Sequence, residues 1–282
     1  MMVHAHPDDE ASKGAGTVAK AHAEGIRTVL VCCTGGEAGD ILNPAMDRDE
    51  VRERLHDVRM EELAEATRII GYDEVVLLGY RDSGMPDSEF NVHPDSFAQA
   101  PLDEAVGRLV AVIRAERPQV IVGYADDRDH YPHPDHLRVH EVTVEAFDAA
   151  GDPDRYPELG EPWQPLKLYY VMWASARIAA THAAFLELGL ESPYDDRWFS
   201  RPAQDHLITT QVDISAYMRV RPEALTAHRT QIDPESPFWF GLPPEVADGI
   251  HPWDDYHLAR SLVDVPLPED DLFAGIRTRV GG

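Results

Sequence analysis

The first half of the chain alternates short apolar runs with segments of helical periodicity, and this alternation limits the fold more than any other feature of the sequence. Residues 26–33 form a near-continuous apolar run, as expected of a strand buried on both faces. Residues 51–69 instead carry apolar side chains at helical spacing, and Gly71 follows where a helix commonly ends. This alternation predicts an α/β protein in which helices cover both faces of a mostly parallel sheet.

The other segments of the first half extend this pattern to a Rossmann-like, doubly wound sheet. Strands are predicted at residues 1–4, 26–33, 74–78 and 119–124, and helices at residues 11–24, 48–70, 102–117 and 134–151. Residues 151–165, which contain four prolines, then interrupt the pattern. We therefore predict a Rossmann-like catalytic core over residues 1–150.

A smaller C-terminal α/β part is predicted over residues 151–282, where it completes the pocket and covers the core. Its strands are predicted at residues 167–173 and 207–214, and its helices at residues 175–188 and 216–230. The tail from residue 234 onward is rich in Pro, Trp and Asp, and we expect it to lie over the surface of the core.

The charge of the chain restricts its partners. The 51 acidic side chains outnumber the 25 basic ones, so the net charge is −26. Nucleic-acid binding depends on clustered Lys and Arg, so we expect neither nucleic acid nor an anionic membrane as a partner. A run of about 18 apolar residues and a secretory signal are both missing, which favours the cytoplasm. A homo-oligomer is compatible with the sequence.

The chain has two cysteines, Cys32 and Cys33, which are neighbours in the predicted strand. Neighbouring side chains on a strand point to opposite faces, so we expect no disulfide between them. This agrees with a reducing compartment.

Two polar motifs follow predicted strands. Residues 6–10 read His-Pro-Asp-Asp-Glu after the first strand, and residues 133–136 read His-Pro-Asp-His after the strand at 119–124. In open α/β sheets, ligands bind at the carboxyl ends of the strands, so both motifs are expected at the same edge. Taken singly, each motif is compatible with a helix N-terminus or a loop. Their shared position favours a functional site.

The residue types in the two motifs suit a hydrolytic metal site. A catalytic zinc site uses three protein ligands, drawn from His and carboxylates, and keeps an open position for water. His6, Asp9 and His136 supply this set, and iron(II) can replace zinc at such ligands. Asp8 remains as a carboxylate that can accept a proton, and His133 can stabilise an oxyanion or protonate a leaving amine.

Two assignments stay open at this level. His4 lies on the same predicted strand face as His6, so geometry alone allows either as a ligand. Asp135 can accept a hydrogen bond from His136 or His133, as metal-binding histidines usually require, or it can cap the following helix.

The two motifs together resemble those of the LmbE-like (PIG-L-like) zinc-dependent N-deacetylases and amidases, and the resemblance covers nearly the whole chain. It implies that zinc is bound by His6, Asp9 and His136, which favours His6 over His4. It further implies that Asp8 is the general base.

The same resemblance implies roles for two more residues. His133 would assist the transition state, and Tyr131 would polarise the scissile carbonyl. Further segments are similar to the mycothiol S-conjugate amidases of actinobacteria: residues 8–14, 34–47, 230–234 and 271–276. Such enzymes cleave the amide between S-conjugated N-acetylcysteine and glucosaminyl-inositol in thiol-based detoxification. Their sister enzymes deacetylate N-acetylglucosaminyl-inositol.

Five residues are expected to bind substrate on the basis of this resemblance. Lys13 lies one helical turn from Asp9 and would help to select the larger conjugate, unless it is an ordinary solvated lysine. The others are Glu37, Arg54, Asp82 and His228. A solvated charge is the alternative for Arg54, and His228 would reach the rim of the pocket.

Two other classes of protein share parts of this sequence pattern. A nucleotide-binding Rossmann protein would share the strand–helix pattern, but no Gly-x-Gly-x-x-Gly follows the first strand, and residues 35–39 have the wrong spacing. A catalytically silent metal-binding protein of the same fold would need neither Asp8 nor His133.

Overall fold

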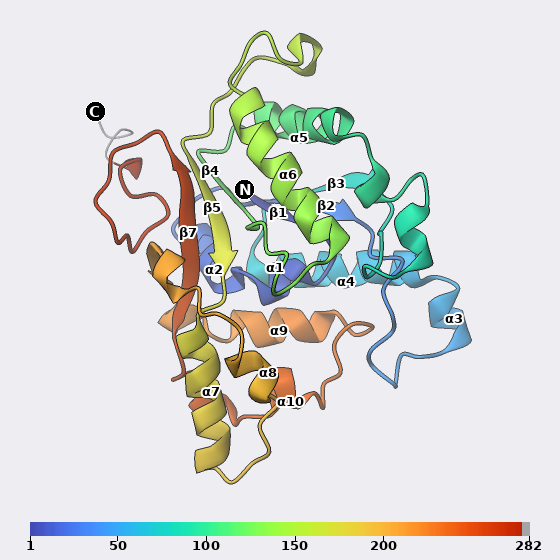
Figure 1. Ribbon diagram of the computed structural model, residues 1–282, viewed down its shortest axis with the longest axis vertical. Helices are drawn as coiled ribbons and strands as arrows, with labels where there is room; N and C mark the ends of the chain where they lie inside the picture. Colours follow the sequence, from blue (N-terminus) through green and yellow to red (C-terminus); the bar gives the residue numbers. More distant parts are fainter. Residues whose placement is uncertain (278–282) are drawn as a thin grey trace.

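The computed structural model describes residues 1–277, which build around one seven-stranded sheet of order β3-β2-β1-β4-β5-β7-β6 (Figure 1). The strands are β1 (Met2–His4), β2 (Val29–Thr34), β3 (Glu74–Tyr80), β4 (Val120–Gly123), β5 (Lys167–Met172), β6 (Thr210–Asp213) and β7 (Trp253–Ser261). Strands β1 to β5 pair in parallel, and β7 is antiparallel to both of its neighbours. The predicted α/β class with a mostly parallel sheet is confirmed.

Helices cover both faces of this sheet (Figure 1). The helices are α1 (Asp9–Ser12), α2 (Ala15–Ala23), α3 (Asp49–Arg52), α4 (Leu55–Ile70), α5 (Leu102–Glu116), α6 (Pro134–Ala149), α7 (Ser175–Glu187), α8 (Asp196–Phe199), α9 (Val220–Ala227), α10 (Pro237–Phe240) and α11 (Pro244–Ala247). One core packs α2, α4 and α9 against the sheet, and the other packs α5 and α6. In residues 1–277, none of the helices has the length and apolarity needed to cross a membrane.

Successive side chains of β2 point to opposite faces of the sheet, so this strand contributes to both hydrophobic cores. Cys32 lies in the core under α2 and α4, whereas Cys33 lies in the core under α5 and α6. Both thiols are free and buried. The prediction that these neighbours do not form a disulfide is confirmed, because the pleat of the strand points them apart.

The first predicted helix is divided by a turn. The sequence pattern predicts one helix over residues 11–24, but α1 ends at Ser12 and α2 begins at Ala15. Gly14, between them, has φ 80°, and a Cβ there would lie 2.9 Å from the Met2 side chain. Such a φ favours glycine, so the chain turns here and α1 stays a short element beside the motif at residues 6–10.

The C-terminal tail differs most from expectation. We expected it to lie over the surface, but it supplies β7, which pairs with β5 and β6 inside the sheet. The sequence does not predict this strand, because Asp254 and Asp255 are typical of surface segments. In the structure both are buried. Arg221 pairs with Asp254 at 2.7 Å and His251 pairs with Asp255 at 2.6 Å. Arg221 and His251 compensate the two buried carboxylates. A prediction based on hydrophobicity alone would not place such charges in a core.

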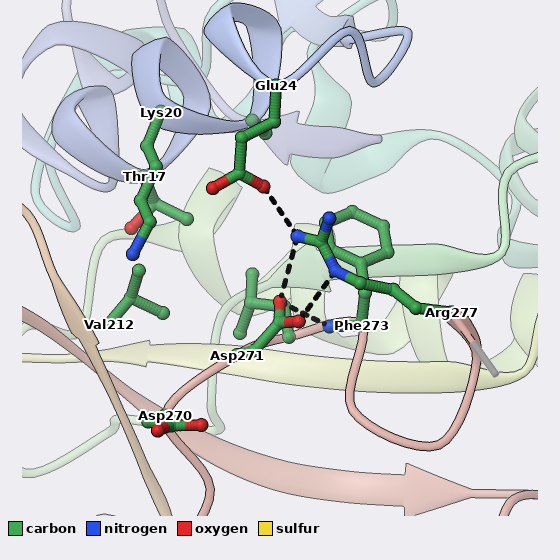
Figure 2. A pocket seen from close by; sticks show the side chains of 10 residues that line it. Thr17, Lys20, Glu24, Val212, Asp270, Asp271, Phe273 and Arg277 are labelled. Carbon is green, nitrogen blue, oxygen red and sulfur yellow. Dashed lines mark hydrogen bonds and ion pairs between the residues drawn. The ribbon is translucent and has the colours of Figure 1, made fainter.

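The last described residues are held against α2 (Figure 2). The Arg277 guanidinium donates to Glu24 at 2.6 Å and to Asp271 at 2.7 Å. These side chains line a cavity of about 310 Å³ whose walls contain none of the predicted site residues. The contacts join the tail to the first half of the chain.

A buried ion pair between β5 and the tail should contribute strongly to stability. Lys167 and Glu269 form this pair, and Glu269 also accepts hydrogen bonds from Tyr169 at 2.6 Å and Thr210 at 3.1 Å. Lys167→Met should lower the free energy of unfolding by about 3 kcal/mol, because an unpaired carboxylate stays buried. Urea unfolding checks this, with Arg27→Met at an exposed ion pair as the control. Equal effects of both substitutions would contradict it.

Candidate metal centre and active site

The two polar motifs meet at the carboxyl ends of β1 and β4. His6 follows β1, and His133 and His136 lie at the start of α6. Helix α6 follows β4 along the chain (Figure 1). The His6 ring lies 4.6 Å from the His133 ring and 5.3 Å from the His136 ring, measured between centroids. The structure thus brings together two motifs that are more than a hundred residues apart in the sequence.

Three buried side chains in this cluster have the spacing of a metal site. Asp9 Oδ2 lies 3.5 Å from His6 Nδ1 and 3.4 Å from His136 Nε2. Two ligand atoms bound to a tetrahedral zinc ion at 2.0–2.1 Å are separated by roughly 3.3 Å. His6, Asp9 and His136 therefore fit a metal ion of this size, and they are the set expected from the sequence.

A second set, His6, Asp82 and His133, also places its ligand atoms close together. It would require Nε2 of His6, but this atom lies 3.2 Å from Asp135 Oδ2. Metal-binding histidines usually donate their second ring N–H to a carboxylate. The hydrogen bond to Asp135 therefore leaves Nδ1 of His6 for the metal, which favours the set with Asp9 and His136.

The protonation states of the cluster suit a cation. Burial lowers the pKa of His136 to about 3, so its ring is neutral, as metal binding requires. Burial tends to raise the pKa of Asp9, but Lys13 and His136 outweigh it and hold that pKa well below its usual value. Burial likewise disfavours a charged His6, but the hydrogen bonds that its ring donates to the carboxylates of Asp135, Asp82 and Asp9 raise its pKa well above the usual value. These carboxylates therefore favour a positive charge at the position of the His6 ring.

Asp135 is held differently from expectation. We expected it to orient His136 or His133, but its carboxylate bonds the His6 ring and the backbone N–H and hydroxyl of Ser83. The start of α6 explains this difference. The Asp135 backbone N–H donates to Nδ1 of His133 at 3.2 Å, so the His133 side chain caps the helix. The Asp135 side chain then points to His6.

Asp135→Asn should weaken zinc binding by roughly 10- to 100-fold, because the His6 ring loses its carboxylate partner. Competition with a chelator measures this affinity. Asp148→Asn, at an exposed position of the same helix, is the control. Zinc affinity equal to that of the unchanged protein would remove Asp135 from this role.

Asp8 lies beside the metal set with its side chain 28% exposed. Its carboxylate accepts a hydrogen bond from Arg59 at 3.1 Å. Burial raises the pKa of Asp8 above its usual value, although the Arg59 charge opposes this. Arg59 also donates to the carbonyls of Pro7 and Gly36, both at 2.5 Å. An accessible carboxylate held in this way can accept a proton from a water molecule.

Two further side chains border the cluster. His133 accepts a hydrogen bond at Nδ1, and burial together with His6 lowers its pKa. The neutral ring therefore carries its proton on Nε2, where it can be donated. The Tyr131 ring meets the His136 ring edge-on at 4.8 Å and is 47% exposed. Burial raises the pKa of Tyr131, which keeps its hydroxyl protonated.

His4, the alternative ligand, does not join the metal set. Its Nδ1 lies 2.7 Å from the Tyr124 hydroxyl, and burial lowers its pKa to about 4. The Tyr124 ring in turn stacks on His136 with centroids 4.5 Å apart. His4 and Tyr124 thus support the ring of His136 from within the core.

The structure places the five expected substrate-binding residues in different surroundings. Lys13 Nζ pairs with Asp9 at 2.5 Å, and Asp82 Oδ1 lies 3.5 Å from His6 Nε2, so both join the cluster. Glu37 lines a cavity of about 600 Å³ at the ends of β2 and β3. Arg54 is 61% exposed and lies 3.6 Å from Asp57.

His228 lies in the interior rather than at the rim. We expected it at the edge of the pocket, but its side chain is fully buried, and its Nε2 lies 2.5 Å from Glu10 Oε1. The ion pair accounts for this position. Burial lowers the pKa of His228, but the Glu10 charge outweighs it and raises that pKa above its usual value.

Sequence reasoning missed Arg59, which the structure places closer to the chemistry than Arg54. Arg59 shares the buried face of α4 with Glu62, Leu63 and Ala66. A charged residue on the buried face of a helix rarely lies there without a specific partner. The position of Arg59 on this face of α4 was therefore the one feature of the sequence that could have indicated its buried role.

Comparison with known families identifies the chain. The family model described as PIG-L: GlcNAc-PI de-N-acetylase matches residues 1–147, which contain both motifs. The chain belongs to the PIG-L family. As a PIG-L protein it is a hydrolase of amide bonds, as the sequence resemblance implied.

Two PIG-L relatives align with almost the whole chain. One is the mycothiol S-conjugate amidase of Streptomyces coelicolor, which is 47% identical over 98% of this chain and 97% of its own length. The other is the 1D-myo-inositol 2-acetamido-2-deoxy-alpha-D-glucopyranoside deacetylase of Streptomyces avermitilis, 39% identical over 98% of this chain and 96% of its own length.

Solved structures share the PIG-L fold of this chain. The N,N'-diacetylchitobiose deacetylase from Pyrococcus horikoshii aligns with a TM-score of 0.63 and 18% identity, covering 91% of this chain and 82% of that protein. The conserved protein TT1542 from Thermus thermophilus aligns with a TM-score of 0.58 and 24% identity, covering 94% and 96%. At these identities the likeness concerns the fold.

Proposed function

We propose that this PIG-L protein is a zinc-dependent amidase of mycothiol S-conjugates. It hydrolyses the amide between S-conjugated N-acetylcysteine and glucosaminyl-inositol, a step of thiol-based detoxification. The observation that carries the proposal is the 47% identity, over 98% of the chain, to a mycothiol S-conjugate amidase. The arrangement of residues at the site supports amide hydrolysis.

Zinc would be held by His6, Asp9 and His136, and when bound there it would lower the pKa of a water molecule and polarise the scissile carbonyl. The choice of zinc over iron rests on the resemblance of both motifs to those of the zinc-dependent N-deacetylases and amidases. The other steps fall to the surrounding side chains.

Asp8 is the general base in this proposal. Its partly exposed carboxylate accepts the proton of the attacking water, while the hydrogen bond from Arg59 fixes its orientation. The water oxygen adds to the carbonyl carbon, and the carbonyl oxygen becomes an oxyanion. The Nε2–H of neutral His133 and the hydroxyl of Tyr131 would donate hydrogen bonds to that oxyanion; the two rings lie with their centroids 6.0 Å apart.

The C–N bond then breaks, and the leaving amine requires a proton. Asp8 carries the proton taken from water, and His133 carries one on Nε2, so each can serve as the donor. The products are the acyl-cysteine conjugate and glucosaminyl-inositol.

Lys13 and Glu37 are the candidates for substrate recognition. Lys13 extends from the turn after α1 and keeps 21% of its side chain exposed beside Asp9. Glu37 has one buried carboxylate oxygen that finds no hydrogen-bond partner within residues 1–277, in the wall of the cavity near β2. Both groups suit the hydroxyls of a glucosaminyl-inositol unit.

The second candidate function is deacetylation of N-acetylglucosaminyl-inositol, favoured by the 39% identity to the Streptomyces avermitilis deacetylase. The two reactions share the site and differ in the acyl group. The test is to compare kcat/KM of the zinc-loaded enzyme for a mycothiol S-conjugate and for N-acetylglucosaminyl-inositol. We expect the higher value for the S-conjugate. A far higher value for the acetylated sugar would overturn the amidase proposal in favour of the deacetylase.

A further inference from the structure

Asp8 has an unfavourable backbone conformation, with positive φ, that contacts with surrounding residues must stabilise. Of the described residues, four other than glycine have positive φ, and Asp8 has the largest, 112° with ψ −25°. Arg117 and Tyr156 lie near φ 50° and ψ 50°, in the ordinary left-handed region. Asp8 is also left-handed, but with a larger φ and a negative ψ. Such strain persists only where surrounding contacts determine the conformation, and it often accompanies function.

Glu10 provides the contact to the backbone of Asp8. The Asp8 backbone N–H donates to Glu10 Oε2 at 2.9 Å, and the other oxygen of Glu10 contacts His228 Nε2 at 2.5 Å. Both Glu10 and His228 are completely buried, so neither can reach a bound substrate. His228 follows α9 and reaches Glu10 from a position 218 residues later in the chain.

The contact on the side-chain side comes from Arg59. Its guanidinium bonds the Asp8 carboxylate at 3.1 Å and the carbonyl of Pro7, the preceding residue. A rotation of the Asp8 backbone to a relaxed φ would move its N–H away from Glu10 or its carboxylate away from Arg59. The two contacts together therefore specify one conformation.

We propose that the buried Glu10–His228 pair is a positioning device for Asp8: it holds the backbone N–H of Asp8, and so aims the carboxylate at the metal site. This inference rests on the proposed function, in which Asp8 is the general base. It makes Glu10 and His228 positioning residues, and it replaces the substrate-binding role that we expected for His228.

The simpler alternative is that the pair only attaches α9 to the core. A neighbouring contact provides the matched comparison, because Thr230 donates from its backbone N–H and its hydroxyl to Glu62 at 3.0 and 2.7 Å. Glu62 and Thr230 are buried as completely as Glu10 and His228. They attach the segment after α9 to α4, whereas Glu10 and His228 attach it to α1. Asp8 is not among their hydrogen-bond partners in residues 1–277. Loss of attachment alone should therefore affect both pairs alike.

The test uses Glu10→Ala, Glu10→Gln and Thr230→Val in the zinc-loaded full-length protein. Glu10→Ala should lower kcat by roughly 10- to 100-fold, because a small displacement of a catalytic group has this cost, with zinc content and KM nearly unchanged. Glu10→Gln keeps an oxygen that accepts from Asp8 and should recover most of kcat. Thr230→Val should lower the melting temperature but leave kcat near that of the unchanged enzyme.

Three outcomes would overturn the proposal. They are an unchanged kcat in Glu10→Ala, an equal loss of kcat in Thr230→Val, and a loss of zinc in Glu10→Ala, which would mean that Glu10 acts through Asp9. If Glu10→Ala does not fold, His228→Leu removes the support of Glu10 and should show the same split between kcat and KM.

A crystal structure of Glu10→Ala, or of His228→Leu in its place, separates this inference from the proposed function. Asp8 should there move to negative φ, even if the enzyme hydrolyses neither test substrate. Asp8 kept at positive φ would overturn the positioning role whatever the activity of the enzyme.

Discussion

Asp8→Asn should lower kcat by about 10²- to 10⁴-fold and leave the zinc content at one ion per chain. The amide cannot accept the proton of water, but it has the shape of the carboxylate. Asparagine also tolerates positive φ better than most residues, so the backbone of Asp8 at φ 112° should be retained. The side-chain oxygen can still accept the hydrogen bond from Arg59.

Zinc content by elemental analysis and steady-state kinetics check this expectation. Asp87→Asn, which makes the same chemical change in an exposed loop, is the control and should leave both unchanged. If zinc is lost from Asp8→Asn, Asp8 is a metal ligand. If turnover is retained, the proton acceptor lies elsewhere.

His136→Ala should weaken zinc binding by more than about 100-fold and abolish turnover at ordinary zinc concentrations. Loss of a residue that only orients a ligand costs roughly 10- to 100-fold in metal affinity, so loss of a ligand should cost more. The reason lies in the geometry: without His136 Nε2, Asp9 Oδ2 keeps only His6 Nδ1 as a nearby histidine ligand atom within the described chain.

The matched control is His140→Ala, one turn further along α6. His140 lies 2.9 Å from the backbone carbonyl of Tyr124 and belongs to neither candidate metal set. Its replacement should keep zinc. Unchanged zinc content in His136→Ala would remove His136 from the ligand set and favour the alternative set of His6, Asp82 and His133.

Much of the fold and the meeting of the two motifs followed from local patterns. Apolar runs such as the one that forms β2 predict buried parallel strands, because only such strands are apolar on both faces. The motifs at residues 6–10 and 133–136 were expected to meet, because each follows a strand of one parallel sheet. These predictions use only the order of elements along the chain.

The missed features depend on contacts between distant residues. Strand β7 was not predicted because Asp254 and Asp255 are residues typical of a surface. Their burial depends on Arg221 and His251, which pair with them only in the folded chain. Arg59 was overlooked for the same reason, since its partner Asp8 lies 51 residues earlier. In a sequence, a buried charge resembles a surface charge until its partner is placed beside it.

The orientation of side chains also escaped prediction. The second motif left open which ring Asp135 would hold, and the answer depends on His133 occupying the capping position of α6. Once Nδ1 of His133 accepts the Asp135 backbone N–H, the Asp135 carboxylate is free to bond His6. Rotamers of this kind are decided by the three-dimensional hydrogen-bond network.

We propose that this site hydrolyses the amide of a mycothiol S-conjugate with the help of a bound metal ion. The most direct test is mass-spectrometric detection of the released acyl-cysteine conjugate, with zinc-loaded enzyme, chelator-treated enzyme and Asp8→Asn compared side by side. We expect release by the zinc-loaded enzyme alone, and added zinc should restore release in the chelated sample. Release that persists after the metal is removed, or no release from folded and zinc-bound protein, would contradict it.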